Sequence, residues 1–205
     1  MAAQHARIIT AALLLAGLTA LMPSRADAQL NLQVVPKIGV FTPLAPFGET
    51  SELQSTLALG LAAELLLPSW PVNLRANLEH ATTTDIVRRD ASETVLGTAR
   101  ITTVVGDVVL RPFAAPATFQ PYLLAGGGVK IHEIDREVGT LDLSGLAERF
   151  TRGTLHVGGG VDARFGPLAV LLEVGNYMST VEAVSGESRV QHDAFGMLGF
   201  RVSMF

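Results

Sequence analysis

The sequence predicts an all-β protein: a closed, antiparallel, up-and-down β-barrel of about eight strands that crosses a membrane. Three observations predict this fold class. Segments recur in which uncharged residues alternate with glycine, polar or charged residues, as strands require. Only 17% of the residues are charged, against roughly 25% in ordinary soluble domains. The chain also begins with a segment typical of exported proteins.

That first segment, residues 1–28, is predicted to be a cleaved secretory signal peptide. Arg7 precedes an apolar run at 8–22, and a small-residue motif ends at Ala28, so cleavage is expected between Ala28 and Gln29. An uncleaved membrane anchor is the alternative. It is disfavoured because the run is shorter than the roughly 20 residues that a spanning helix needs. Residues 29–205 then form one barrel domain.

Eight segments of this domain carry the alternation. From Leu155 to Phe165 every second residue is uncharged, while the residues between them are His156, two glycines, Asp162 and Arg164. Residues 55–65 remain ambiguous, because Leu, Ala and Glu also favour helix. The other seven segments are PKIGVFTPL (36–44), STLALGLAAEL (55–65), VNLRANLEH (72–80), VVGDVVLR (104–111), PYLLAGGGVKIH (121–132), AVLLEVGNY (169–177) and LGFRVSM (198–204).

The connections between these strands alternate in length. This pattern predicts short turns at one end of the barrel, facing the periplasm, and long loops at the outer end. Proline and glycine in the short connections are typical of turns. The short connections are 68–71, 114–118 and 166–167, and the long ones are about 45–54, 83–97, 135–152 and 180–191.

Alternation alone does not say which face points inward, and a soluble lipocalin-like barrel would alternate too. Glycine is best explained inside a narrow barrel, where side chains from eight strands compete for volume. The apolar faces then point outward and need lipid as their solvent. Aromatic residues at the short-turn ends, Trp70, Phe113, Phe119 and Phe165, fit an interfacial girdle.

Charged residues on the predicted inward faces are balanced, six positive against six negative. Because unpaired charge in a narrow interior is costly, the balance predicts a plug of mutual salt bridges. A selective pore would be expected to show a ring of one sign, although a conducting channel stays open as an alternative. The predicted network comprises Lys37, Glu64, Arg75, Glu79, Asp107, Arg111, Lys130, Asp162, Arg164, Glu173, Asp193 and Arg201.

The sequence gives few indications of a bound metal ion, cofactor or nucleic acid. His132, His156 and His192 are weak candidates for a metal site near the long-loop end, with membership of a hydrogen-bonded network as the alternative. The chain has no cysteine, which excludes thiolate ligands, and no cofactor is expected. A net charge of -4 without clustered Lys and Arg argues against nucleic-acid binding.

Across residues 29–205 the chain resembles the small eight-stranded outer-membrane barrels of the OmpA, OmpX and OmpW type. The segments that carry the resemblance are PKIGVFTPL, PYLLAGGGVKIH, LHVGGGVDARFG, LLEVGNY and GFRVSMF. The resemblance implies a bacterial outer-membrane location, with outer-membrane lipid and the barrel assembly machinery as partners. Phe205 resembles the terminal assembly signal of such barrels, although Ser203 stands where that signal has a large apolar residue.

The resemblance leaves the activity open, and the expected function is a membrane anchor or scaffold whose loops recognise a surface ligand. Residues 141–150 form either a short helix or a surface loop that contacts a partner or lipid. A narrow channel or carrier for a small apolar molecule is the second hypothesis. A lipid-modifying enzyme is the third; lipid A deacylases of similar size carry a His-x-Ser motif, which none of His80, His132, His156 and His192 forms.

Overall fold

The computed structural model describes residues 31–44, 51–67, 70–88, 95–112, 118–136, 149–166, 168–182 and 188–202. By its internal contacts the chain divides into Met1–Leu30 and Asn31–Phe205, and every described residue belongs to the second unit. The predicted signal peptide, its cleavage site between Ala28 and Gln29, and Phe205 lie outside the described residues. Within those residues no helix is long and apolar enough to cross a membrane.

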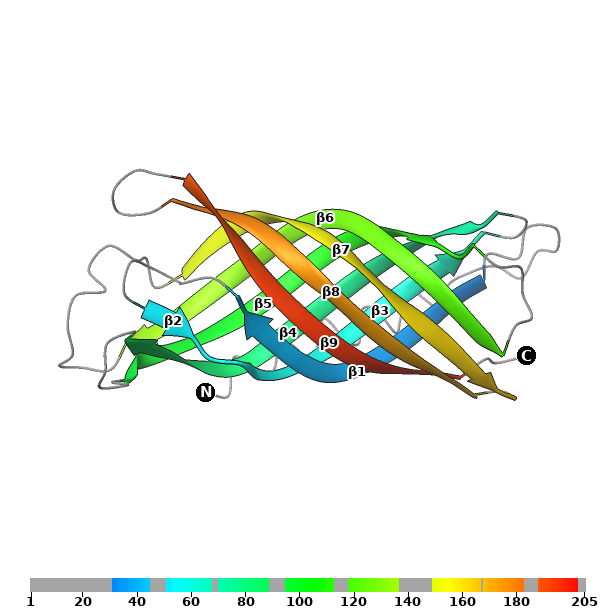
Figure 1. The fold of residues 1–205 in the computed structure, drawn as a ribbon, viewed down its shortest axis with the longest axis horizontal. Coiled ribbons are helices and arrows are strands. Elements are labelled where there is room, and N and C mark those ends of the chain that lie inside the picture. The colour runs from blue at the N-terminus through cyan, green and yellow to red at the C-terminus, as the bar shows by residue number, and fades with distance from the viewer. Residues whose placement is uncertain are drawn as a thin grey trace, which may run out of the picture. The chain divides into compact units, whose positions relative to one another are not determined.

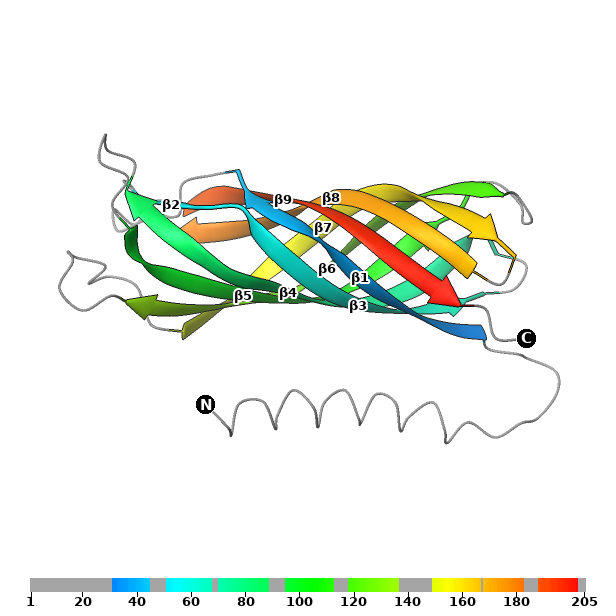
Figure 2. The same ribbon diagram turned by 90° about the horizontal axis from the view of Figure 1, so that it is seen from below.

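The second unit is a closed antiparallel barrel (Figure 1). Each long strand pairs with the next one along the chain, and β1 and β9 lie side by side to close the barrel (Figure 2). This confirms the predicted fold class. The described strands are β1 (Asn31–Pro43), β2 (Ser51–Leu53), β3 (Thr56–Leu66), β4 (Val72–Arg88), β5 (Val95–Leu110), β6 (Phe119–Arg136), β7 (Arg149–Phe165), β8 (Leu168–Glu182) and β9 (Ser188–Val202).

Among the described residues, the short strand β2 is the one element beyond the eight that were predicted. It pairs with the far end of β4, with Leu53 opposite Ile86, while β3 pairs with β4 from Ala58 onward. Gln54 lies between β2 and β3, and its backbone N–H donates to the carbonyl of Asp85 in β4 at 3.1 Å. The two segments therefore act as one interrupted strand along β4, and the barrel itself has eight.

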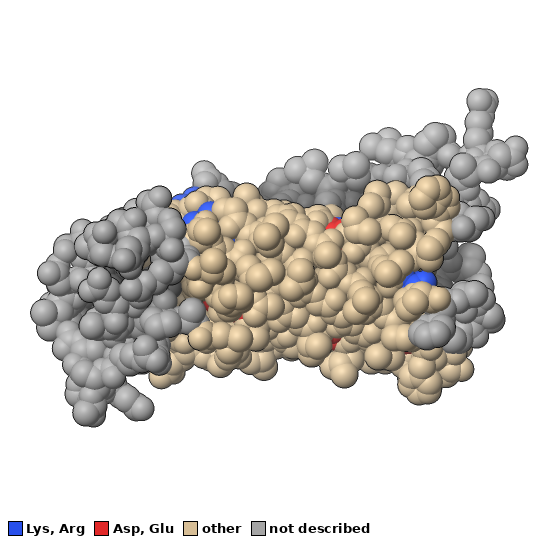
Figure 3. All heavy atoms as spheres, turned by 45° about the horizontal axis from the view of Figure 1, so that its top comes forward, with Lys and Arg blue, Asp and Glu red and all other residues tan. Residues whose placement is uncertain are grey.

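The alternation assigns the two faces of each strand as predicted. Along β7 the side chain of Leu155 is 61% exposed while that of the next residue, His156, is fully buried. The described surface of the barrel is mostly uncharged on the face shown in Figure 3. An apolar exterior around a polar interior is the arrangement that a lipid solvent requires.

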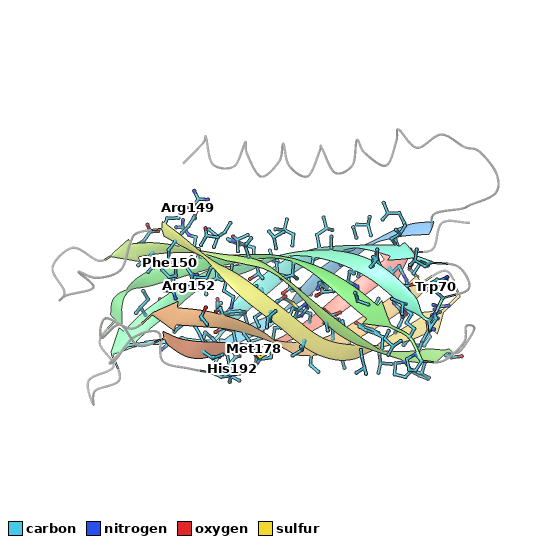
Figure 4. All side chains as sticks on the ribbon, turned by 90° about the horizontal axis from the view of Figure 1, so that it is seen from above. Trp70, Arg149, Phe150, Arg152, Met178 and His192 are labelled. Carbon is cyan, nitrogen blue, oxygen red and sulfur yellow. The ribbon has the colours of Figure 1, made fainter. Side chains whose placement is uncertain are left out.

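The height of the apolar exterior fits a bilayer. On β7 the outward residues from Leu155 to Phe165 are all uncharged. Ten steps of about 3.3 Å, tilted by about 40°, span about 25 Å, which is the height of the apolar band of outer-membrane barrels. Trp70, Phe119 and Phe165 are exposed at the short-turn end of this band, and Figure 4 shows Trp70 at the opposite end from Arg149.

The short turns lie where they were expected. Gly166, between β7 and β8, has a φ of 62°, a conformation that glycine adopts without the clash a Cβ would cause. Phe113, the fourth predicted girdle residue, lies outside the described residues.

The extent predicted for the long connections was wrong. Strands β4, β6 and β8 continue to Arg88, Arg136 and Glu182, and β5, β7 and β9 begin at Val95, Arg149 and Ser188. Arg149 and Phe150 therefore lie in β7 and not in a helix or surface loop, while residues 141–148 lie outside the described part of the chain.

The strands extend further than predicted because the inward and outward faces exchange their polarity beyond the apolar band. There the inward side chains become apolar, such as Ile101 and Ile134, and the outward ones become charged, such as Arg100 and Glu133. A register shift in β4 between Ala81 and Thr84 also breaks the alternation. We call this outer part of the barrel the collar. The buried apolar cluster inside it also reaches into the apolar band, where Tyr177 and Phe195 pack on His156. The cluster comprises Phe41, Leu53, Ala58, Ala81, Ile86, Ala99, Ile101, Val105, Ile134, Tyr177, Phe195 and Met197, with Phe150 packed against it.

Two substitutions on the outer face of β7 test where the lipid ends. Val161→Arg places a charge within the apolar band and should lower the free energy of unfolding by about 2–4 kcal/mol in lipid. Thr151→Arg places the same side chain on the collar, where the cost should stay below about 1 kcal/mol. Urea unfolding of both variants in vesicles measures the difference. Equal costs would mean that the two positions share one solvent.

Candidate functional site: the charged lumen

Glu64 is the centre of the polar lumen nearest the short-turn end. Its carboxylate accepts from the guanidinium groups of Arg75 at 2.7 Å and Arg111 at 2.9 Å. It also accepts from the amide of Asn73 at 2.8 Å. All of these side chains are buried, so one negative charge is shared between two buried arginines.

Asp162 is the second carboxylate of this region. It pairs with Arg201 and with Arg111, whose Nη1 lies 3.4 Å away. Arg164 donates instead to the side-chain oxygen of Gln120 at 2.9 Å. We call Glu64, Arg75, Arg111, Asp162, Arg164 and Arg201 the turn-end cluster.

Lys37 lies at the centre of the next layer of the lumen. Its Nζ donates to Glu79 at 2.5 Å, to Asn77 at 2.9 Å and to Glu173 at 3.1 Å. Glu173 also pairs with Arg75 and therefore links this layer to the turn-end cluster.

Two tyrosines complete this layer. The Tyr122 hydroxyl donates to Glu173 at 2.8 Å, and the guanidinium groups of Arg75 and Arg111 lie 5.0 and 5.1 Å from the centre of its ring. The Tyr177 hydroxyl donates to Glu79 at 2.7 Å. Cations over ring faces and hydroxyls on carboxylates stabilise the charges that the layer buries.

The last polar layer joins the network to the collar. His156 Nδ1 lies 2.8 Å from a carboxylate oxygen of Asp107, and the imidazole stacks on the Tyr177 ring at 4.5 Å. Lys130 pairs with Asp193 and lies 5.4 Å from the centre of the Tyr177 ring. Beyond these groups the interior is the apolar core of the collar.

All eight barrel strands contribute to this network. Of the twelve charged residues predicted for the lumen, eleven are buried and Arg164 is half-buried. Because buried side chains have almost no contact with water, the layers fill the lumen where they lie. Sequence reasoning left out six neutral members of the network on the same inward faces, which alternation alone could have supplied: Asn73, Asn77, Gln120, Tyr122, Tyr177 and Gln191.

Glycines on the inward faces make room for the aromatic rings of the network. A Cβ added to Gly160 would lie 2.3 Å from the Leu172 carbonyl oxygen and 2.6 Å from the Tyr122 ring, and one added to Gly175 would lie 2.6 Å from the Phe195 ring. Gly160 therefore gives Tyr122 the space from which it reaches Glu173.

The structure does not bring the three candidate metal ligands together. His156 binds Asp107, His132 stacks on Phe150 at 4.5 Å, and His192 is exposed and lies 3.3 Å from Asn176 on the outside of the barrel (Figure 4). In the described ranges no three His, Cys, Asp or Glu residues are placed to hold a metal ion. His192 lies near the long-connection end, but it points outward because it alternates with the inward Gln191 and Asp193.

Together, the apolar band on the outside and the filled polar lumen define a transmembrane β-barrel. No protein-family model matches the chain, and no curated protein matches it. Among solved structures it is similar to Neisserial surface protein A, with a TM-score of 0.55 and 11% identity over 84% of this chain and 97% of that one. This likeness shows the fold.

Two further solved structures are similar at lower scores. Outer membrane protein OprG of Pseudomonas aeruginosa has a TM-score of 0.49 and 14% identity over 86% of this chain and 97% of that one. Outer Membrane Protein W of E. coli has a TM-score of 0.48 and 14% identity over 85% of this chain and 100% of that one.

Removing one charge from the network should cost more than removing an exposed charge. Glu173→Gln leaves Lys37 and Arg75 short of a buried partner and should lower the free energy of unfolding by about 3–5 kcal/mol. The matched control Glu133→Gln breaks an exposed pair with Arg149 and should cost at most about 1 kcal/mol. Chemical denaturation in detergent compares them. Similar small costs would indicate a hydrated lumen.

The space beside Tyr122 can be tested within one strand. Gly160→Val should displace the ring from Glu173 and destabilise the barrel by about 1–3 kcal/mol. Gly153→Val, on the outside of the same strand, meets nothing within 4 Å and should have little effect on stability. Thermal unfolding and the ring resonances of Tyr122 report both changes. Unshifted resonances in Gly160→Val would contradict the role of this glycine.

Proposed function

We propose that the protein is an integral outer-membrane anchor and scaffold with a closed lumen, which presents its long connections for recognition outside the bilayer. The observation that carries this proposal is the layered charge network from Glu64 to Asp193. A conducting lumen would need a continuous water path. Buried ion pairs at successive levels leave little room for one.

The collar supports the second half of the proposal. Its outward residues are joined by exposed ion pairs between neighbouring strands, Arg100 with Asp135 at 3.1 Å and Glu133 with Arg149 at 3.6 Å. Inside it has an ordinary apolar core. Such a folded extension beyond the lipid is a rigid base on which recognition segments can be held.

A carrier for a small apolar molecule is the second candidate, and the apolar interior of the collar favours it. Residues such as Ile101 and Phe195 would contact such a ligand. They are already buried against one another, however, so the collar would have to open for a ligand to enter.

Envelope lipid hydrolysis remains the third candidate. A hydrolase needs a nucleophile beside its base. The described His–Asp pair, His156 with Asp107, has a tyrosine and a phenylalanine ring against the imidazole, which is packing typical of a structural core.

Single-channel recording in planar bilayers tests the closed lumen. Folded protein, verified by heat-modifiable gel mobility, should insert without steady conductance. The same preparation should not hydrolyse lipid in a fatty-acid release assay. Steady conductance would contradict the proposal and favour a channel, and saturable uptake of an apolar dye that Ile101→Asn abolishes would favour the carrier.

A further inference from the structure

The positive and negative charges of the lumen are equal in number but are not evenly distributed along the barrel. The turn-end cluster has four arginines but only two carboxylates of its own, Glu64 and Asp162. The rest of the lumen has the opposite excess. Its charged members are Lys37, Lys130, Glu79, Asp107, Glu173 and Asp193.

Sharing does not satisfy all four guanidinium groups. Glu64 serves Arg75 and Arg111, Asp162 serves Arg111 and Arg201, and Glu173 of the next layer also serves Arg75. Within the described part of the chain, the buried Nε atoms of Arg164 and Arg201 have no hydrogen-bond partner, and neither does the buried Oδ1 of Asp162. The short connections 67–71, 112–118 and 166–167 contain no acidic residue that could supply one.

Arg164 and Arg201 stand on either side of one small residue. Ala169 pairs with Arg164 across β7 and β8 and with Arg201 across β8 and β9. Ala169 is buried and lies on the inward face. Between the two arginines, at the end of the lumen, the wall therefore carries only the small methyl group of Ala169. The barrel wall separates this position from the surrounding lipid.

From this arrangement we propose that the short-turn mouth of the lumen is a binding site for a small tetrahedral oxyanion, phosphate or sulfate, held between Arg164 and Arg201. A guanidinium group presents a planar fork of donors that matches two oxygens of such an anion. A bound anion would offset the excess of arginine over carboxylate in the turn-end cluster and would offer acceptors to the two Nε atoms.

Inorganic phosphate is the probe for this site. Titration calorimetry on the folded barrel in a zwitterionic detergent, with sodium chloride at matched ionic strength as the reference, should show saturable binding of phosphate and of sulfate. Arg164→Gln should weaken binding about tenfold or more, because it removes a charge-assisted donor pair. The control Arg149→Gln, an exposed arginine at the opposite end of the barrel, should leave the affinity unchanged.

Arg164 is the informative position because it is only half-buried, so its loss should leave the barrel folded. Arg164→Lys keeps the charge without the fork and should bind more tightly than Arg164→Gln. Arg201→Gln should also weaken binding if it folds. Phosphate heat no greater than that of chloride for the wild-type protein would overturn the proposal, as would unchanged affinity in a folded Arg164→Gln protein. Acetate binding as tight as phosphate would contradict a preference for tetrahedral anions.

Discussion

The constraint on which this structure depends is that backbone N–H and C=O groups in hydrocarbon must find partners within the protein. A strand cannot satisfy them alone, so the sheet has to close, as it does where β1 pairs with β9. Closure then leaves each side chain only two directions. Outward side chains meet lipid in the apolar band, and polar side chains can only point into a narrow lumen.

The second consequence is that charged side chains in the lumen have to be neutralised by other groups of the protein. Charges without bulk water are tolerated when paired and hydrogen-bonded, which explains why lysine, arginine, tyrosine and amide groups converge on a few carboxylates. Glu173 illustrates this coupling, since Lys37, Arg75 and Tyr122 all donate to it. A network with such shared members stabilises the barrel only as a whole.

Much of the fold could be predicted because alternation is a local signal: residues 155–165 alone indicate a strand between two solvents. The signal failed where the solvent changes, between the outward Ile131 and the inward Ile134, and where the register shift follows Ala81. The charged members of the lumen could be predicted from parity, but their partners could not. Lys37 and Glu173 are 136 residues apart, and their contact depends on closure and strand tilt.

The central claim is that β7 passes from lipid into water between Leu155 and Thr151 while its other face stays in a packed lumen. Because the chain has no cysteine, single cysteines can carry spin labels along this strand in vesicles. Labels at 157, 161 and 163 should be relaxed by oxygen, and those at 149 and 151 by a water-soluble nickel reagent. A label at 156 or 162 should be reached by neither. Nickel access at 157 and 161 would contradict the account.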